Sequence, residues 1–109
     1  MSNNYKKIPK AVRDNIASYI ISLEKDNLPI EKVVLFGSYA KGTQHQWSDI
    51  DLCIVSPKFR NAWQATQYLW SKRINDIGLT IEPVGFSPVD YKSESPLLAE
   101  IKRTGIRVD

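Results

Sequence analysis

Two aspartates that are two residues apart are the most chemically informative feature of the sequence. Asp49 and Asp51 belong to the segment SDIDLCIV, whose apolar residues predict a strand over residues 49–55. Side chains alternate between the faces of a strand, so both carboxylates point the same way, with Cα atoms about 6–7 Å apart. Carboxylates about 4 Å apart would repel each other by roughly 4 kcal/mol at an effective dielectric constant of 20. The pair therefore predicts either a raised pKa or a bound cation, and oxygen ligands suit Mg²⁺.

A third acid is expected close to this pair. Glu82 lies inside the otherwise apolar segment LTIEPVGF, where an ionised side chain needs a partner or a metal. We therefore expect Glu82 to join Asp49 and Asp51 at one metal site. The alternative is that Glu82 faces water from an edge strand. Asp90 is a rival third acid, but it follows a Ser-Pro turn and is expected on a loop.

A glycine–serine pair predicts a phosphate-binding turn beside the acids. Gly37 and Ser38 follow the apolar run VVLF and precede one expected helical turn over residues 39–41. Backbone N–H groups at such a turn form a concave site for anions, and glycine lets a phosphate approach the backbone closely. A plain turn is the alternative interpretation. Together the turn and the acids indicate phosphoryl or nucleotidyl transfer.

The remaining pattern predicts an α/β (α+β) fold, a small mixed β-sheet of three to four strands flanked by helices. Pro83 cannot donate to a strand ladder, so the strand that carries Glu82 is expected at an edge or at a bulge. The predicted elements are a helix from Ile8 to Asn27 with Pro9 in its first turn, a strand over 31–36, a helix from Ala62 to about Ile77 capped by Asn61 and ended by Gly78, a strand over 79–86, a helix after Ser95-Pro96 with Leu97, Leu98 and Ile101 inward, and a strand over 106–108.

Composition limits the class of protein. The 109 residues predict a single domain over 1–109 with flexible residues 1–7, and the net charge of +3, from 15 basic and 12 acidic residues, is spread without a basic block. This distribution argues against nucleic acid as the direct target. The one cysteine, Cys53, is expected in the core and permits no internal disulfide. The absence of signal-peptide and membrane-length apolar runs predicts a cytoplasmic chain that does not bind a membrane.

The histidine and two tryptophans have less specific interpretations. His45 lies in a polar segment without other ligands at metal-binding spacing, so it is expected on an exposed loop. Trp63 and Trp70 are seven residues apart and share one helix face, which predicts a core or interface position. If they form an exposed apolar stripe, that stripe would mark a surface for a partner.

The segment GSYAKGTQHQWSDIDL resembles the motif of the nucleotidyltransferase superfamily that includes DNA polymerase beta. The short chain also resembles the minimal nucleotidyltransferase (MNT) domain proteins, which are typically encoded beside a HEPN-domain partner as toxin–antitoxin pairs. The ending SPLLAEIKRTGIRV is similar to the close of many such domains, so the resemblance covers residues 31–108. It implies the polymerase beta-like nucleotidyltransferase fold.

The resemblance also implies a role for each matching residue. Asp49 and Asp51 would bind two Mg²⁺ ions, and Glu82 would be the third acid, which activates the attacking hydroxyl. The chain departs from the superfamily here, because the third acid is more often aspartate. The nucleotide triphosphate would be held by Gly37, Ser38, Lys41 and Ser48.

These roles imply a Mg²⁺-dependent enzyme that transfers a nucleoside monophosphate, AMP from ATP, to a hydroxyl acceptor. In the MNT and HEPN setting the acceptor would be a tyrosine of the HEPN toxin, and the chain would be its antitoxin. One alternative is a non-catalytic binding module that neutralises its partner by occlusion. Another is transfer to a small molecule such as an antibiotic. An open site on so small a domain could be completed by partner docking or by homo-oligomer formation.

Overall fold

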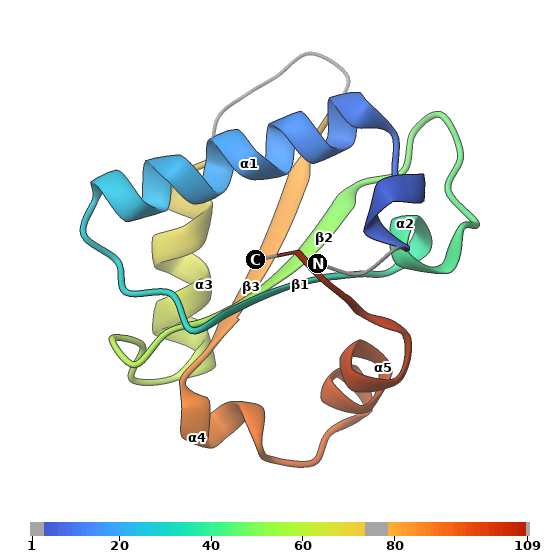
Figure 1. The fold of residues 1–109 in the computed structure, drawn as a ribbon. Coiled ribbons are helices and arrows are strands. Elements are labelled where there is room, and N and C mark those ends of the chain that lie inside the picture. The colour runs from blue at the N-terminus through green and yellow to red at the C-terminus, as the bar shows by residue number, and fades with distance from the viewer. Residues whose placement is uncertain (1–3, 74–78, 109) are drawn as a thin grey trace.

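The computed structural model describes residues 4–73 and 79–108, and its strands form one four-stranded sheet (Figure 1). The spatial order is β3-β2-β1-β4, in which only the β2–β3 pair is parallel. This mixed sheet, flanked by helices, confirms the predicted fold class. The strands are β1 (Lys32–Phe36), β2 (Ile50–Val55), β3 (Ile81–Phe86) and β4 (Ile106–Arg107).

Helices cover both faces of the sheet. In Figure 1, α1 and α3 lie over one face, and α4 and α5 lie against the other. None of the helices in the described ranges is both long and apolar enough to cross a membrane. The helical elements are a 3₁₀ turn (Tyr5–Lys7), α1 (Lys10–Lys25), α2 (Ser38–Lys41), α3 (Ala62–Ser71), α4 (Pro88–Tyr91) and α5 (Pro96–Thr104).

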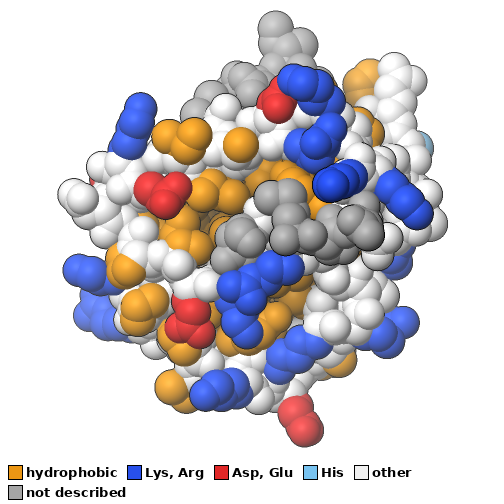
Figure 2. All heavy atoms as spheres, in the orientation of Figure 1, with side chains coloured by type: hydrophobic (Ala, Val, Ile, Leu, Met, Phe, Trp, Pro, Cys, Tyr) orange, Lys and Arg blue, Asp and Glu red, His pale blue; other side chains and the backbone are white. Residues whose placement is uncertain are grey.

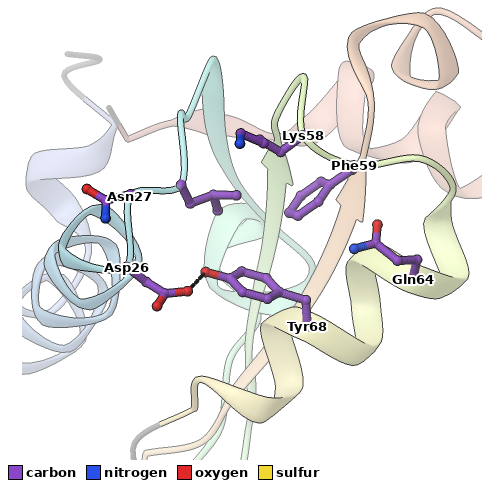
Figure 3. Close-up of a pocket in the computed structure, with 7 residues that line it drawn as sticks. Asp26, Asn27, Lys58, Phe59, Gln64 and Tyr68 are labelled. Carbon is purple, nitrogen blue, oxygen red and sulfur yellow. Dashed lines mark hydrogen bonds between the residues drawn. The ribbon is translucent and has the colours of Figure 1, made fainter.

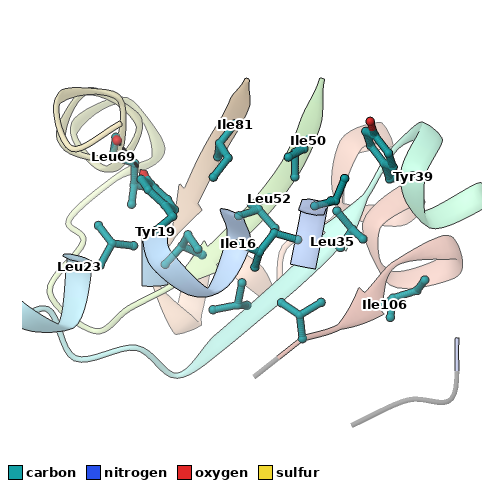
Figure 4. Close-up of a cluster of buried hydrophobic side chains, with 14 of the residues drawn as sticks. Ile16, Tyr19, Leu23, Leu35, Tyr39, Ile50, Leu52, Leu69, Ile81 and Ile106 are labelled. Carbon is teal, nitrogen blue, oxygen red and sulfur yellow. Dashed lines mark hydrogen bonds between the residues drawn. The ribbon is translucent and has the colours of Figure 1, made fainter. Parts of the chain in front are cut away.

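The larger hydrophobic core lies between the sheet and helices α1 and α3 (Figure 4). Ile16 and Leu23 of α1 are fully buried, as are Leu35 and Leu52 of the sheet. Each such side chain stabilises the fold by about 1.5–3 kcal/mol relative to an exposed one. The Tyr19 hydroxyl donates to the Leu69 carbonyl at 2.7 Å, which joins α1 to α3. This core fixes the strand pair on which the site is built.

The smaller core lies on the opposite face. Val34 and Cys53 of the sheet pack there with Leu98 and Ile101 of α5, all of them buried. The position of Cys53 confirms the prediction of a small core residue. Because side chains alternate along β2, Asp51 lies on the same face as Cys53. The acids therefore lie on the α4 and α5 side of the sheet.

Two helix boundaries differ from those predicted. Helix α3 ends at Ser71 rather than near Ile77, because the Lys72 N–H bonds to the Leu69 carbonyl and tightens the last turn. The predicted end over Ile74–Gly78 lies outside the described residues. Pro9 is the N-cap of α1 rather than a residue of its first turn, and its carbonyl accepts the first helical N–H groups.

The C-terminal third contains two further corrections. Ser87 caps the short helix α4 by accepting the Asp90 N–H at 3.0 Å, so Asp90 lies on a helix and not on a loop. Leu97 is 38% exposed rather than inward, because only Leu98 and Ile101, three residues apart, face the sheet.

Other predictions for this part of the chain are confirmed. The Ser95 hydroxyl accepts the Leu98 N–H at 3.1 Å and so caps α5. The strand that contains Pro83 is at the edge of the sheet, and a short last strand is present as β4.

Candidate active site

The parallel pairing of β2 and β3 places two of the predicted acids side by side. Asp51 is in register with Glu82, and Asp49 lies just before β2 begins. The charge of Asp49 raises the pKa of Glu82, and the charges of Asp49 and Glu82 raise the pKa of Asp51, so the three carboxyl groups are electrostatic neighbours. The structure thus brings together three acids that come from distant parts of the sequence.

Burial and neighbouring charge raise the pKa values of Asp51 and Glu82. The pKa of Asp51 is raised to about 6, chiefly by burial and then by the charges of Glu82 and Asp49. Burial also raises the pKa of Glu82, as do the charge and hydrogen bond of Asp49, while Arg73 opposes the shift. Asp51 and Glu82 therefore hold a proton more readily than isolated carboxyl groups, and a bound cation would balance the negative charge of the three acids.

The donor chemistry of this site suits a hard divalent cation. Among residues 4–73 and 79–108, no group of three His, Cys, Asp or Glu side chains is preassembled for a metal ion. Mg²⁺ commonly takes only one or two carboxylates and completes its shell with water and substrate phosphates. Asp49 and Asp51 fit that arrangement, with Glu82 as the neighbouring charge. The residues present therefore fit Mg²⁺ together with a nucleotide, rather than a metal held by protein alone.

The Gly37 turn lies in direct contact with these acids. Gly37 has φ 75° and ψ −153°, a backbone conformation open only to glycine. A Cβ at this position would come within 2.1 Å of Asp51 Oδ2. Ser38 then begins α2, and the Gly37 carbonyl accepts the Lys41 N–H at 3.1 Å. The turn that could receive a phosphate and the carboxylates that could hold a metal are thus parts of one site.

Lys41 pairs with an acid that the sequence pattern did not single out. Its Nζ lies 2.9 Å from Glu100 Oε1, and this ammonium group lowers the pKa of Glu100. Glu100 in turn contributes to the raised pKa of Asp51. Helix α5 therefore adds a fourth acid to the surroundings of the site. The sequence alone does not indicate that Glu100 lies close to Lys41, because Glu100 belongs to an ordinary amphipathic segment. The position of α5 against the sheet brings the two residues together.

Ser48 makes local contacts in the loop before β2. Its hydroxyl accepts the His45 N–H at 2.9 Å, and its own N–H donates to the His45 carbonyl at 3.0 Å. These bonds fix the backbone immediately before Asp49. His45 itself is exposed, as predicted.

Trp63 and Trp70 are not core residues. Trp63 is 73% exposed and Trp70 is 43% exposed, because the inward positions of α3 are Ala65 and Leu69. The Trp70 Nε1 donates to the Pro83 carbonyl at 3.0 Å. Trp70 thus lies beside the strand segment that carries Glu82, and the alternative interpretation of this face as an interface stays a prediction.

Arg73 is a site neighbour that the sequence pattern did not indicate. Its guanidinium lies 4.1 Å from the centroid of the Trp70 ring, a cation–π contact. Its charge also opposes the raised pKa of Glu82. The acids therefore have one nearby cation on the β3 side of the sheet.

A separate pocket lies at the other end of the sheet (Figure 3). Its volume is about 280 Å³, and its lining residues precede β1 or follow β2, whereas the Gly37 turn follows β1. The Tyr68 hydroxyl donates to the Asp26 carboxylate and lowers its pKa. This contact joins α3 to the end of α1, and the pocket shares no residue with the acid site.

Comparison with known proteins assigns the family. The model of the nucleotidyltransferase domain matches residues 6–105, which is most of the chain. The chain belongs to the nucleotidyltransferase domain family. Within this family it is 35% identical over 85 residues to the protein adenylyltransferase MntA of Shewanella oneidensis. That match covers 74% of this chain but 55% of MntA, so the chain spans about half the length of this curated relative.

Solved structures agree with this assignment. A crystal structure of a toxin–antitoxin with AMP-PNP is 28% identical with a TM-score of 0.54, over 84% of this chain and 71% of that one. A nucleotidyltransferase structure from Sulfolobus solfataricus has a TM-score of 0.67 at 14% identity, covering 98% of this chain and 87% of that one. The second likeness concerns the fold alone, and it extends over nearly the whole chain.

Proposed function

We propose that this chain is a Mg²⁺-dependent nucleotidyltransferase that transfers AMP from ATP to a hydroxyl group. The observation that carries the proposal is the contact between the Gly37 turn and Asp51, which is itself paired with Glu82. A phosphate held at the turn would lie against the carboxylates. The similarity to a protein adenylyltransferase and to a structure with AMP-PNP supports ATP as the nucleotide.

Residues of this chain would bind the phosphates, hold the metal ion and accept the proton. Gly37 and Ser38 hold the phosphates at the turn, with Lys41 as a second cation once it leaves Glu100. Asp49 and Asp51 would hold Mg²⁺, which when bound neutralises charge on the phosphates. Glu82 takes the proton of the acceptor hydroxyl. The acceptor oxygen then bonds to the α-phosphorus, the bond to the β-phosphate oxygen breaks, and pyrophosphate leaves.

We infer that the acceptor is a tyrosine of a HEPN-type toxin and that the chain acts as its antitoxin. The toxin–antitoxin similarity supports this partner, and the exposed side of Trp70 beside β3 leaves room for a protein acceptor close to Glu82. The AMP group would add a bulky anion to the tyrosine. Such a modification would act on the toxin through charge repulsion and steric bulk.

Differential labelling of ATP tests both parts of the proposal. The protein, Mg²⁺ and a purified HEPN protein encoded beside its gene are incubated with ATP labelled at either the α- or the γ-phosphate. AMP transfer puts only the α-label on the HEPN protein, and a Tyr→Phe change at the labelled position removes it. Label from the γ-phosphate would indicate phosphoryl transfer instead. If no label moves while the complex still suppresses toxicity, neutralisation is by occlusion.

A further inference from the structure

A cavity lined by basic residues lies on the same face of the sheet as the carboxylates. Its volume is about 390 Å³, and its cationic lining is Lys32 of β1, Lys102 of α5 and Arg107 of β4. Tyr91 of α4 forms part of the same wall, and none of the residues in 4–73 and 79–108 that line the cavity is acidic. Figure 2 shows Lys and Arg side chains over much of the face in this view, with a few Asp and Glu side chains among them. Three separate elements thus bring positive charge to one place.

The cavity is separate from the candidate active site. Lys32 pairs with Val55 at one end of the β1–β2 ladder, and Phe36 pairs with Asp51 at the other. Four residues of strand separate the two ends by about 13 Å. A ligand in the cavity therefore occupies a different site from a nucleotide held at Gly37.

The two lysines lie close to one aromatic ring, and Lys102 Nζ also donates to the Ser93 carbonyl at 3.4 Å. Lys32 Nζ lies 5.0 Å from the centroid of the Tyr91 ring, and Lys102 Nζ lies 5.1 Å from it. Neither lysine forms a salt bridge with an acid in the described ranges. The two ammonium groups are at most about 10 Å apart and repel each other, and an anion bound in the cavity would relieve that repulsion.

Arg107 and the floor of the cavity favour a phosphate over a simple halide. Arg107 Nη2 donates to the Glu31 carbonyl at 3.2 Å, which orients the guanidinium beside β1. A planar guanidinium together with two ammonium groups suits an anion that has several acceptor oxygens. The floor consists of buried Val34 and Ile101, and this apolar backing strengthens the attraction between charges above it.

We propose that the cavity between Tyr91, Lys32, Lys102 and Arg107 is a second anion site that binds a phosphate group. The phosphate belongs either to a small molecule or to the backbone of a nucleic acid, and the chemistry of recognition is the same for both. The site does not depend on the nucleotidyl transfer proposed above, because it shares no residue with that machinery.

Nuclear magnetic resonance of the whole chain without ATP or Mg²⁺ tests this proposal. Inorganic phosphate and a 12-nucleotide single-stranded RNA are titrated in separate arms at constant ionic strength, with chloride as the reference salt. The resonances followed are the Tyr91 ring and the Lys32 and Lys102 side chains. We expect saturable shifts at these groups, with affinity about tenfold weaker in the Lys32→Gln/Lys102→Gln double variant. The matched control is Lys6→Gln/Lys25→Gln, which removes the same charge from exposed positions elsewhere.

The outcomes separate the two sources of phosphate. Saturation by inorganic phosphate assigns a small-molecule phosphate site, whereas saturation by RNA alone assigns the nucleic-acid backbone. The proposal is overturned if neither probe gives saturable shifts in the wild-type chain. It is also overturned if the control variant weakens binding as much as the Lys32 and Lys102 pair does. The titration of the wild-type chain tests whether the cavity binds phosphate even if the double variant folds poorly.

Discussion

The α-carbon of Gly37 lies against the carboxylate of Asp51, so closely that a methyl group on it would come within 2.1 Å of Oδ2. These two residues belong to different segments of the chain and to different parts of the proposed chemistry. Their contact means that the turn cannot carry a side chain while Asp51 keeps its position. The phosphate turn and the carboxylates therefore have to be considered as one unit.

The first prediction follows from this contact. Gly37→Ala should destabilise the protein by about 1–3 kcal/mol, because alanine adds backbone strain and displaces Asp51. Gly42→Ala is the matched control, since Gly42 also has a positive φ of 73° but a Cβ there would meet no atom within 4 Å. Thermal unfolding of both variants measures the difference. Adding Asp51→Ala to Gly37→Ala should recover part of the lost stability. Strictly additive changes in the free energy of unfolding would contradict the contact between the two residues.

The second prediction concerns pH. Because the pKa of Asp51 is raised to about 6, the folded protein retains a proton that the unfolded chain has released between about pH 4 and 6. The contribution of Asp51 to the stability of the metal-free protein is therefore fully present below about pH 4 and is lost as pH rises through 6. After allowance for solvent screening the loss is about 1 kcal/mol, or roughly 4–8 °C in Tm.

Two controls test the origin of that pH dependence. Asp51→Asn should flatten the profile and raise Tm at pH 7.5, while Asp14→Asn, at an exposed acid of α1, should leave the profile unchanged. Mg²⁺ should raise Tm more at pH 7.5 than at pH 5, because protons compete with the metal at low pH. A Mg²⁺ effect that is equal at the two pH values would argue against carboxylate binding.

The third prediction concerns the Lys41–Glu100 pair. An exposed ion pair of this kind contributes little to stability, so Lys41 can leave Glu100 for a phosphate at little cost. Glu100→Gln should tighten ATP binding by up to about fivefold, and Lys41→Met should weaken it. Isothermal titration with AMP-PNP and Mg²⁺ provides the affinities. If both variants change the affinity in the same direction, Lys41 does not contact phosphate.

The sequence predicted the strands that carry the acids, an edge or a bulge at Pro83 and Glu82 as the candidate third acid, because each depends on local alternation or on one proline. Asp51 and Glu82 are 31 residues apart, yet both lie on strands whose faces can be read from their apolar neighbours. Glu100 could not be predicted in the same way. Its proximity to Lys41 depends on how α5 returns across the sheet, and no local pattern encodes that path.

The tryptophans show the limit of hydrophobic periodicity. Spacing of seven residues placed Trp63 and Trp70 on one helix face, but it could not decide whether that face is inward. In the structure the small residue Ala65 and Leu69 take the inward positions, which lets α3 approach β3 closely. Hydrophobic spacing alone therefore did not determine which face of α3 is inward.

The fourth prediction follows from that orientation. Trp63→Gln should change the free energy of unfolding by less than about 0.5 kcal/mol, because the side chain is exposed. Leu69→Ala, on the buried face of the same helix, should cost about 2–5 kcal/mol. If the outer face of α3 binds the partner protein, Trp63→Gln should weaken that complex while AMP-PNP binding stays unchanged. Loss of fold in Trp63→Gln would instead show that the side chain supports the core.

The most direct measurement of the central claim is transfer of the α-phosphate of labelled ATP to the HEPN protein in the presence of Mg²⁺. The wild-type chain should label the acceptor, and Asp49→Asn or Asp51→Asn should reduce the rate by about a hundredfold or more. Asp14→Asn should retain the wild-type rate. Equal labelling by the Asp49→Asn variant and the wild type, or no α-label on the acceptor with either, would contradict the account.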